Sequence, residues 1–140
     1  MANMSDYLEG QIIKYWLQND GTAAAKPVTV YVALYTVLPS DPSASGTEVT
    51  GGSYARVAVT NSSANWPGPT SNNGTVTNGA AITFPAPTAN WGTIVGMAVY
   101  DAATTGNELF WGQLTTSKTV NSGDPAPSFA IGALSIQIDN

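Results

Sequence analysis

The side chains that most often perform catalysis are missing or isolated in this sequence. It contains neither histidine nor cysteine, so the commonest general base, the commonest transition-metal ligand and every thiolate nucleophile are absent. A serine nucleophile needs an adjacent base, and the lysines stand in no recognisable motif. We therefore expect no catalytic residue and no cofactor, and we predict that the protein is not an enzyme.

One pair of carboxylates stands close enough in sequence to be weighed as a catalytic pair. Asp101 and Glu108 flank a single predicted turn, and paired carboxylates can hydrolyse glycosidic bonds. The structural alternative is a solvated hairpin loop, in which Asp101 starts the turn by bonding its own backbone. We favour the structural alternative, because acidic residues at turns usually have this role.

Metal or phosphate binding would have to use oxygen ligands or backbone groups. Asp41, Glu48 and Asp124 lie in predicted loops, but none has the alternating spacing of a calcium loop. We name no metal ligand, although a structural calcium ion stays open. Gly51 and Gly52 precede a predicted strand rather than a helix, which predicts a tight turn or bulge and not a phosphate loop.

The charge of the chain argues against two classes of partner. The net charge is −5 and only 9% of the residues are charged, against about 25% in a typical domain. The four basic residues, Lys14, Lys26, Arg56 and Lys118, are scattered singly. Nucleic acids and anionic membranes both need clustered positive charge, so we expect neither as a partner.

No targeting or membrane segment is recognisable in the sequence. It has no run of about 18 apolar residues, which a membrane-spanning helix would need, and no signal-peptide pattern. We therefore expect synthesis in a host cytoplasm, with release by lysis if the protein works outside a cell.

An amphipathic helix is predicted over residues 6–18. Ser5 or Asp6 can cap it, and Leu8, Ile12, Tyr15 and Trp16 fall on one face at helical spacing. Two uses of this face stay open. It packs against the sheet of its own subunit, which we favour as the ordinary way to cover a sheet, or it binds a neighbouring subunit.

Three tryptophans lie outside this helix, and two of them are weighed here as contact or core residues. Trp66 lies in the long polar stretch 61–78, where it is the best candidate for an exposed contact, including a stacking contact with a sugar. Trp111 lies in a predicted strand and is expected in the core. The candidate interface residues are therefore Leu8, Ile12, Tyr15, Trp16 and Trp66.

The rest of the chain reads as short strands separated by Pro, Gly and Asn turns. The segment 28–37 is apolar on both faces, which predicts a central strand covered on two sides. Further strands are predicted over 54–60, 81–84, 93–100, 108–116, 128–131 and 134–138. This spacing predicts a mainly β fold, an antiparallel β-sandwich of jelly-roll-like or Ig-like type preceded by one amphipathic helix. We divide the chain into a helix and arm, 1–27, and a β-sandwich domain, 28–140.

A series of motifs in a fixed order covers nearly the whole chain. They are Met4-Ser-Asp-Tyr-Leu-Glu9, Thr29-Val-Tyr-Val-Ala-Leu-Tyr-Thr36, Gly46-Thr-Glu-Val, Gly51-Gly-Ser-Tyr-Ala-Arg56, Ile82-Thr-Phe, Ala89-Asn-Trp-Gly-Thr93, Val99-Tyr-Asp-Ala102, Leu109-Phe-Trp-Gly112 and Lys118-Thr-Val-Asn-Ser-Gly123. In this order the chain resembles a family of small structural proteins of tailed bacteriophages, labelled tail fibre or virion structural proteins, some of which look like capsid decoration (cement) proteins. The resemblance implies a β-sandwich and assembly into homo-oligomers, expected to be trimers. It supplies no catalytic motif.

Three functions follow as hypotheses. The first is a capsid decoration protein that binds the major capsid protein on the outer surface of the head and clamps neighbouring capsomers, using many weak contacts over a symmetric lattice. The second is a component of a tail fibre or head appendage, which would contact host glycans. The third is a free carbohydrate-binding module.

Overall fold

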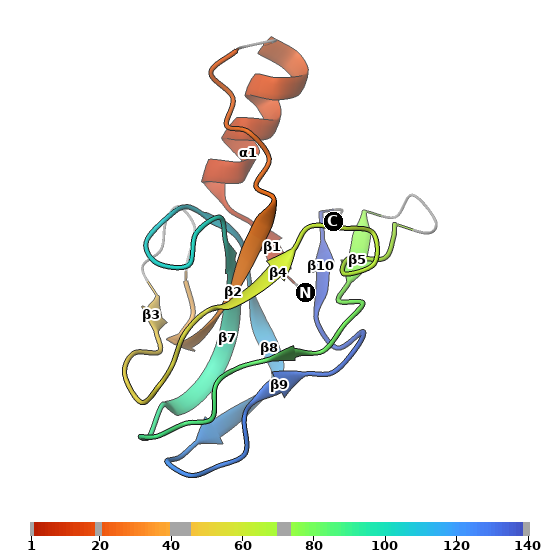
Figure 1. Cartoon of the computed structure of the whole chain (residues 1–140). Helices are drawn as coiled ribbons and strands as arrows, with labels where there is room; N and C mark the ends of the chain where they lie inside the picture. The colour runs from red at the N-terminus through yellow and green to blue at the C-terminus, as the bar shows by residue number, and fades with distance from the viewer. Residues whose placement is uncertain (1, 19–20, 40–45, 70–73, 139–140) are drawn as a thin grey trace.

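The computed structural model describes residues 2–18, 21–39, 46–69 and 74–138 as one mainly β body from which a helix projects (Figure 1). The helical part is α1 (Asp6–Ile13), continued by the π-helical segment η1 (Lys14–Gln18). The strands are β1 (Ala2–Met4), β2 (Thr29–Val37), β3 (Thr47–Glu48), β4 (Val57–Thr60), β5 (Thr75–Thr77), β6 (Ile82–Thr83), β7 (Gly92–Tyr100), β8 (Glu108–Val120), β9 (Ser128–Phe129) and β10 (Ser135–Gln137). No helix among these residues is long and apolar enough to cross a membrane.

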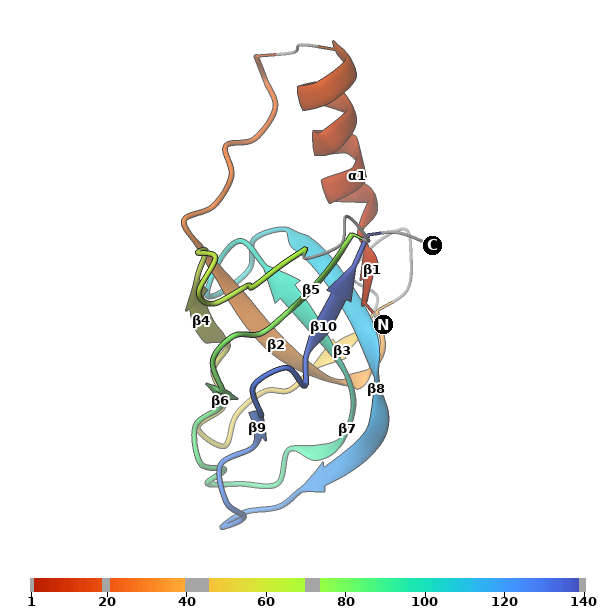
Figure 2. The ribbon, with the colours of Figure 1, turned by 90° about the vertical axis from the view of Figure 1, so that its right-hand side faces the viewer.

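The described strands form two sheets. The main sheet has the order β3-β2-β7-β8-β1-β10-β5, and β4 pairs with the first half of β2, which β3 does not reach. A small second sheet joins β6 to β9. All pairings are antiparallel except that of β1 with β10. Strands β5, β10, β6 and β9 lie over the layer made by β2, β7 and β8 (Figure 2). The predicted antiparallel β-sandwich with one preceding helix is confirmed.

The main core lies between these two layers. Val30, Val32 and Leu34 of β2 face Ile82 of β6 and Ile136 of β10 in one buried cluster. The opposite face of β2 carries Ala33 and Tyr35, which are buried with Ala98 and Tyr100 of β7. The prediction that β2 is a central strand with two apolar faces is therefore confirmed.

Three strands were not predicted, and each is short and held by a distant partner. β1 pairs with β8 and β10, β3 pairs with the end of β2, and β5 pairs with β10. β5 lies in the stretch 61–78 that the sequence predicted as loop. These segments lack an apolar period of their own, so tertiary pairing decides their conformation. The strand predicted over 54–60 is shorter than expected, because β4 begins at Val57. Tyr54 lies before the strand, and its ring packs on Trp91 and Phe84.

Candidate assembly interface

The first turn of α1 is fixed to the β body by its capping residue. Ser5, which is 8% exposed, accepts a hydrogen bond from the backbone N–H of Leu8 through its Oγ. The same hydroxyl donates to the carbonyl of Glu108, and the Ser5 N–H donates to the carbonyl of Leu109 at 3.0 Å. Tyr7 and Leu8 pack against the main core. The predicted cap at Ser5 is confirmed, and it also sets where the helix leaves the sheet.

Beyond this turn the helix leaves the body and exposes its apolar side chains. The exposed fractions are 47% for Ile13, 68% for Tyr15, 75% for Trp16 and 81% for Leu17. We call these four residues the α1 tip. The Tyr15 and Trp16 rings meet edge to face, with centroids 5.5 Å apart. This exposed apolar cluster makes the α1 tip a candidate interaction surface.

The predicted stripe along the helix is therefore divided. Leu8 packs on its own body and Ile12 is half-buried, while Tyr15 and Trp16 are exposed. The favoured expectation, that the stripe covers the sheet of its own subunit, is wrong for its distal half. The helix points away from the sheet because β1 and Ser5 fix its direction at the base.

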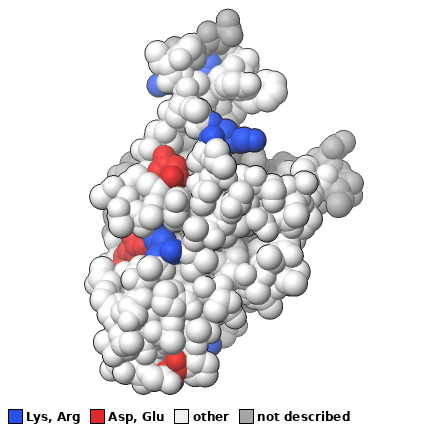
Figure 3. Space-filling view, in the orientation of Figure 1, with Lys and Arg blue, Asp and Glu red and all other residues white. Residues whose placement is uncertain are grey.

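The arm that returns from the helix to β2 is also exposed. Residues 24–26 and Val28 are exposed, and the Ala24 N–H donates to Gln11 Oε1 at 2.7 Å. The helix and the arm run side by side away from the body (Figures 1 and 2). In the space-filling view most of the visible surface is uncharged (Figure 3), in keeping with the 9% of charged residues.

Trp66 does not belong to this surface. It is half-buried and packs against the main core. Its indole nitrogen is buried and meets no hydrogen-bond acceptor among the described residues. Trp66 is therefore less exposed than predicted. The turn at residues 62–66, in which the Trp66 backbone N–H donates to the Ser62 carbonyl, directs its ring toward the core. Trp111 is half-buried against the cluster of Ala33 and Tyr100.

The sequence did not predict a buried polar cluster on the far face of β2. Arg56 makes a bidentate ion pair with Glu48 of β3, and its Nη1 donates to the carbonyls of Ala102 and Thr105 at 3.0 and 2.8 Å. Its guanidinium lies over the Tyr100 ring, 3.6 Å from the centroid. Nothing in the spacing of these residues shows that they meet, since they come from three separate segments.

Two tyrosines extend the same cluster. The Tyr54 hydroxyl donates to Glu48 Oε1 at 2.9 Å and accepts from the Leu34 N–H. The Tyr100 hydroxyl bonds to the Tyr35 hydroxyl and donates to the carboxylate of Glu108 at 3.1 Å. Burial raises the pKa of Tyr54 and of Tyr100, so both phenols remain protonated donors. The arrangement ties β3, β2 and the 101–107 turn together.

The two carboxylates weighed as a catalytic pair have separate environments. Asp101 Oδ1 accepts the Asn107 N–H and Oδ2 accepts the Asn107 side-chain amide, both at 2.7 Å. The predicted structural role of Asp101 in the turn is confirmed. Glu108 is only 8% exposed, so the prediction that it belongs to a solvated loop is wrong. It is drawn inward because the Tyr100 hydroxyl donates to it.

The acidic residues considered for calcium have other partners. Glu48 binds Arg56 and Tyr54, and Asp124 accepts the Asn121 N–H at 2.7 Å. Asp41 lies outside the described residues. In the described part of the chain no group of three or more histidine, cysteine, aspartate or glutamate residues could hold a metal ion. Gly51 and Gly52 both have positive φ, at 73° and 56°, which confirms the predicted tight turn.

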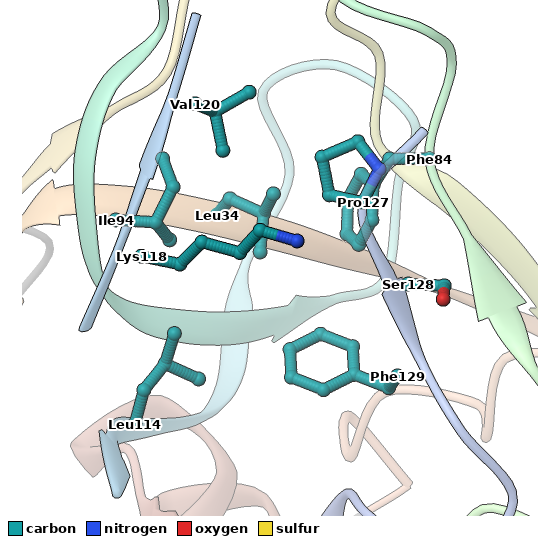
Figure 4. A pocket seen from close by; sticks show the side chains of 9 residues that line it. All are labelled: Leu34, Phe84, Ile94, Leu114, Lys118, Val120, Pro127, Ser128 and Phe129. Atoms are coloured by element: carbon teal, nitrogen blue, oxygen red, sulfur yellow. The ribbon is translucent and has the colours of Figure 1, made fainter. Parts of the chain in front are cut away.

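A small pocket opens between the main sheet and β9. Its volume is about 70 Å³, room for only a few water molecules. Figure 4 shows the side chain of Lys118 crossing a mostly apolar lining, with Phe84, Pro127 and Phe129 around it.

A small β-sandwich with a projecting apolar helix is typical of a protein that works by assembly. The family model described as Podophage GP4 fiber I protein gp80 matches residues 3–137, so the chain belongs to that family. It is a bacteriophage virion structural protein, as the resemblance in the sequence implied. No curated protein matches the chain.

Proposed function

We propose that this protein is a component of a phage fibre or appendage, and that its copies assemble through the α1 tip. The observation that carries the proposal is the exposure of Tyr15, Trp16 and Leu17, at 68%, 75% and 81%, on a helix whose base is fixed to the body by Ser5. The family description names a fiber protein, which supports this assignment over the other hypotheses.

The free energy available at the tip is sufficient for assembly. Burying a large apolar side chain contributes about 1.5–3 kcal/mol, so four side chains contribute roughly 6–12 kcal/mol per copy. Association costs on the order of 4–15 kcal/mol, which the burial of two or more tips offsets. We propose a homo-oligomer, a trimer as the resemblance implies, in which three tips enclose one shared apolar core.

We also propose that the protein performs no catalysis. Arg56, Glu48, Tyr54 and Tyr100, the polar groups that burial could activate, are bonded to one another. Neither histidine nor cysteine is present. Nucleic acid and membrane are not proposed as partners, because the basic residues are isolated.

A capsid decoration protein is the second candidate. The observation that favours it is the combination of one small body with few charged residues and one apolar projection (Figures 1 and 3), which also suits attachment to the major capsid protein at many lattice positions. A free carbohydrate-binding module is the third candidate. The half-burial of Trp66, the side chain predicted to stack on a sugar, against the main core speaks against it.

Immunogold labelling of purified particles distinguishes the first two candidates, together with the copy number from quantitative mass spectrometry. A fibre component labels the tail or an appendage in few copies, and its antibody blocks adsorption. Labelling of the whole head in hundreds of copies would replace the proposal with decoration. A glycan array with the soluble protein tests whether the fibre also contacts host sugars.

A further inference from the structure

We propose that copies of this protein exchange β1, so that the gap between β8 and β10 of one subunit is filled by Ala2–Met4 of another. This inference rests on the proposed assembly through the α1 tip and names the second contact that such an assembly would use. The partner is a second copy of this chain.

The site for β1 is defined by strand register. Ala2, Asn3 and Met4 lie opposite Gly112, Trp111 and Phe110 of β8, and Ala2 also pairs with Ile136 of β10. β1 is thus a strand between two others, and without it the facing edges of β8 and β10 would lack their pairing. Unpaired strand edges readily accept an added strand.

The connection from β1 to the rest of the chain permits this exchange. Between β1 and β2 the chain runs out along α1 and η1 and returns along the arm (Figure 2). Residues 24–26 and Val28 of the arm are exposed, and the hydrogen bond from the Ala24 N–H to Gln11 Oε1, at 2.7 Å, is exposed as well. Opening the arm therefore uncovers little buried surface.

Exchange keeps the contacts of β1 and adds new ones at the tip. Ser5, Tyr7 and Leu8 would make the same contacts with the β8 of the partner that they make within one copy. In the proposed assembly the tips of the exchanged helices cover one another, including Trp16 and Leu17, which are 75% and 81% exposed in a single copy. The exchanged oligomer therefore differs from the separate copies in free energy mainly by the burial of the tips.

The absence of natural cysteine allows a direct crosslinking test. Met4 and Phe110 are opposed residues, and the Ser5 N–H to Leu109 carbonyl bond sets them as a non-hydrogen-bonded pair, whose Cα atoms lie about 4.5 Å apart. Chains carrying only Met4→Cys and chains carrying only Phe110→Cys are unfolded together, refolded and oxidised. Exchange predicts a disulfide-linked heterodimer on a non-reducing gel.

Matched controls keep the result decisive. The double variant Met4→Cys/Phe110→Cys shows whether the two cysteines can join at all, and the opposed pair Ala2→Cys/Gly112→Cys replaces it if folding fails. A mixture of Thr93→Cys and Thr119→Cys chains gives the background, because these hydroxyls touch at 2.9 Å within the β7–β8 hairpin of one copy.

Each outcome decides something different. A heterodimer well above the Thr93/Thr119 background supports exchange. A heterodimer at background level in a sample that sediments as an oligomer overturns exchange and leaves assembly through the tip intact. A sample that sediments as a monomer at all concentrations overturns both.

Discussion

Arg56 and Glu48 form a bidentate ion pair, with Nε 2.9 Å from Oε1 and Nη2 2.8 Å from Oε2, at the β3 edge of the main sheet. The Arg56 side chain is only 8% exposed and that of Glu48 is 23% exposed. The pair joins β3 to the 101–107 turn, since the same guanidinium donates to the carbonyls of Ala102 and Thr105. It is a structural connection between segments far apart in the sequence.

Removing the guanidinium should destabilise the protein strongly. Breaking a buried pair by removal of one partner costs about 3–5 kcal/mol, because the remaining charge is left in a site of low polarity. We expect Arg56→Met to lower the free energy of unfolding by about 3 kcal/mol, as measured by urea denaturation. Lys118→Met, at an exposed position, is the control and should change it little. An equal loss in both variants would contradict this role of the ion pair.

The stability of the β body should fall at alkaline pH. Burial raises the pKa of Tyr54 and Tyr100 above the ordinary value of 10.0. The unfolded phenols lose their protons first, so the folded state is favoured below pH 10 and loses this advantage as the pH rises further. Urea midpoints between pH 8 and pH 11 should therefore decline above pH 10. Tyr100→Phe should make the decline shallower, whereas Tyr15→Phe, at an exposed site, should leave it unchanged.

Gly52 should tolerate a side chain less well than its neighbour Gly51. Both have positive φ, but a Cβ at Gly52 would lie 2.9 Å from Trp91 Nε1, whereas a Cβ at Gly51 meets nothing within 4 Å. Alanine at either position costs about 1–2 kcal/mol from the backbone conformation. Gly52→Ala should cost more than Gly51→Ala and should shift the tryptophan fluorescence, since the Trp91 indole donates to the Gly52 carbonyl. Equal losses of stability would refute the close contact.

Polar substitutions at the α1 tip should change assembly without changing the fold. Trp16→Ser/Leu17→Ser removes two side chains that are 75% and 81% exposed, so the melting temperature of the β body should shift by no more than a few degrees. Sedimentation velocity should show the oligomer becoming a monomer. Ile131→Ser, which removes an apolar side chain that is 70% exposed on the body, should leave the oligomer intact. An oligomer that persists in the Trp16→Ser/Leu17→Ser variant would contradict assembly through the tip.

The fold was largely predictable because its long strands carry their own signal. The β-branched and apolar runs at 28–37 and 93–100 predicted both β2 and β7 to within a residue, since two-faced burial selects β-branched and apolar residues. The strands of two or three residues, β1, β3 and β5, have no such period. They exist because β8, β2 and β10 offer them a partner, and that information is not local.

The candidate interface was predictable only in part, for a related reason. The spacing of Leu8, Ile12, Tyr15 and Trp16 predicts one apolar face along the helix. Its division into a packed base and an exposed end depends on β1 and on the bonds of Ser5 to residues 108 and 109, which fix the direction of the helix. The same limit applies to Trp66, which a polar sequence context placed on the surface and which the turn at Ser62 folds inward. Arg56 and Glu48 could not be paired from sequence, because a lone charge of each sign is most often solvated.

The protein content of purified virions is the most direct test of assembly through the α1 tip. Particles are produced with either the natural chain or the Trp16→Ser/Leu17→Ser variant, and the amount of the protein that sediments with them is quantified. We expect the natural chain to be a constant component of the particle, and the variant to be folded and soluble in the lysate but lost from the particle. Assembly through the α1 tip would be contradicted if the natural chain were absent from mature particles, or if the variant were present in them at the same level.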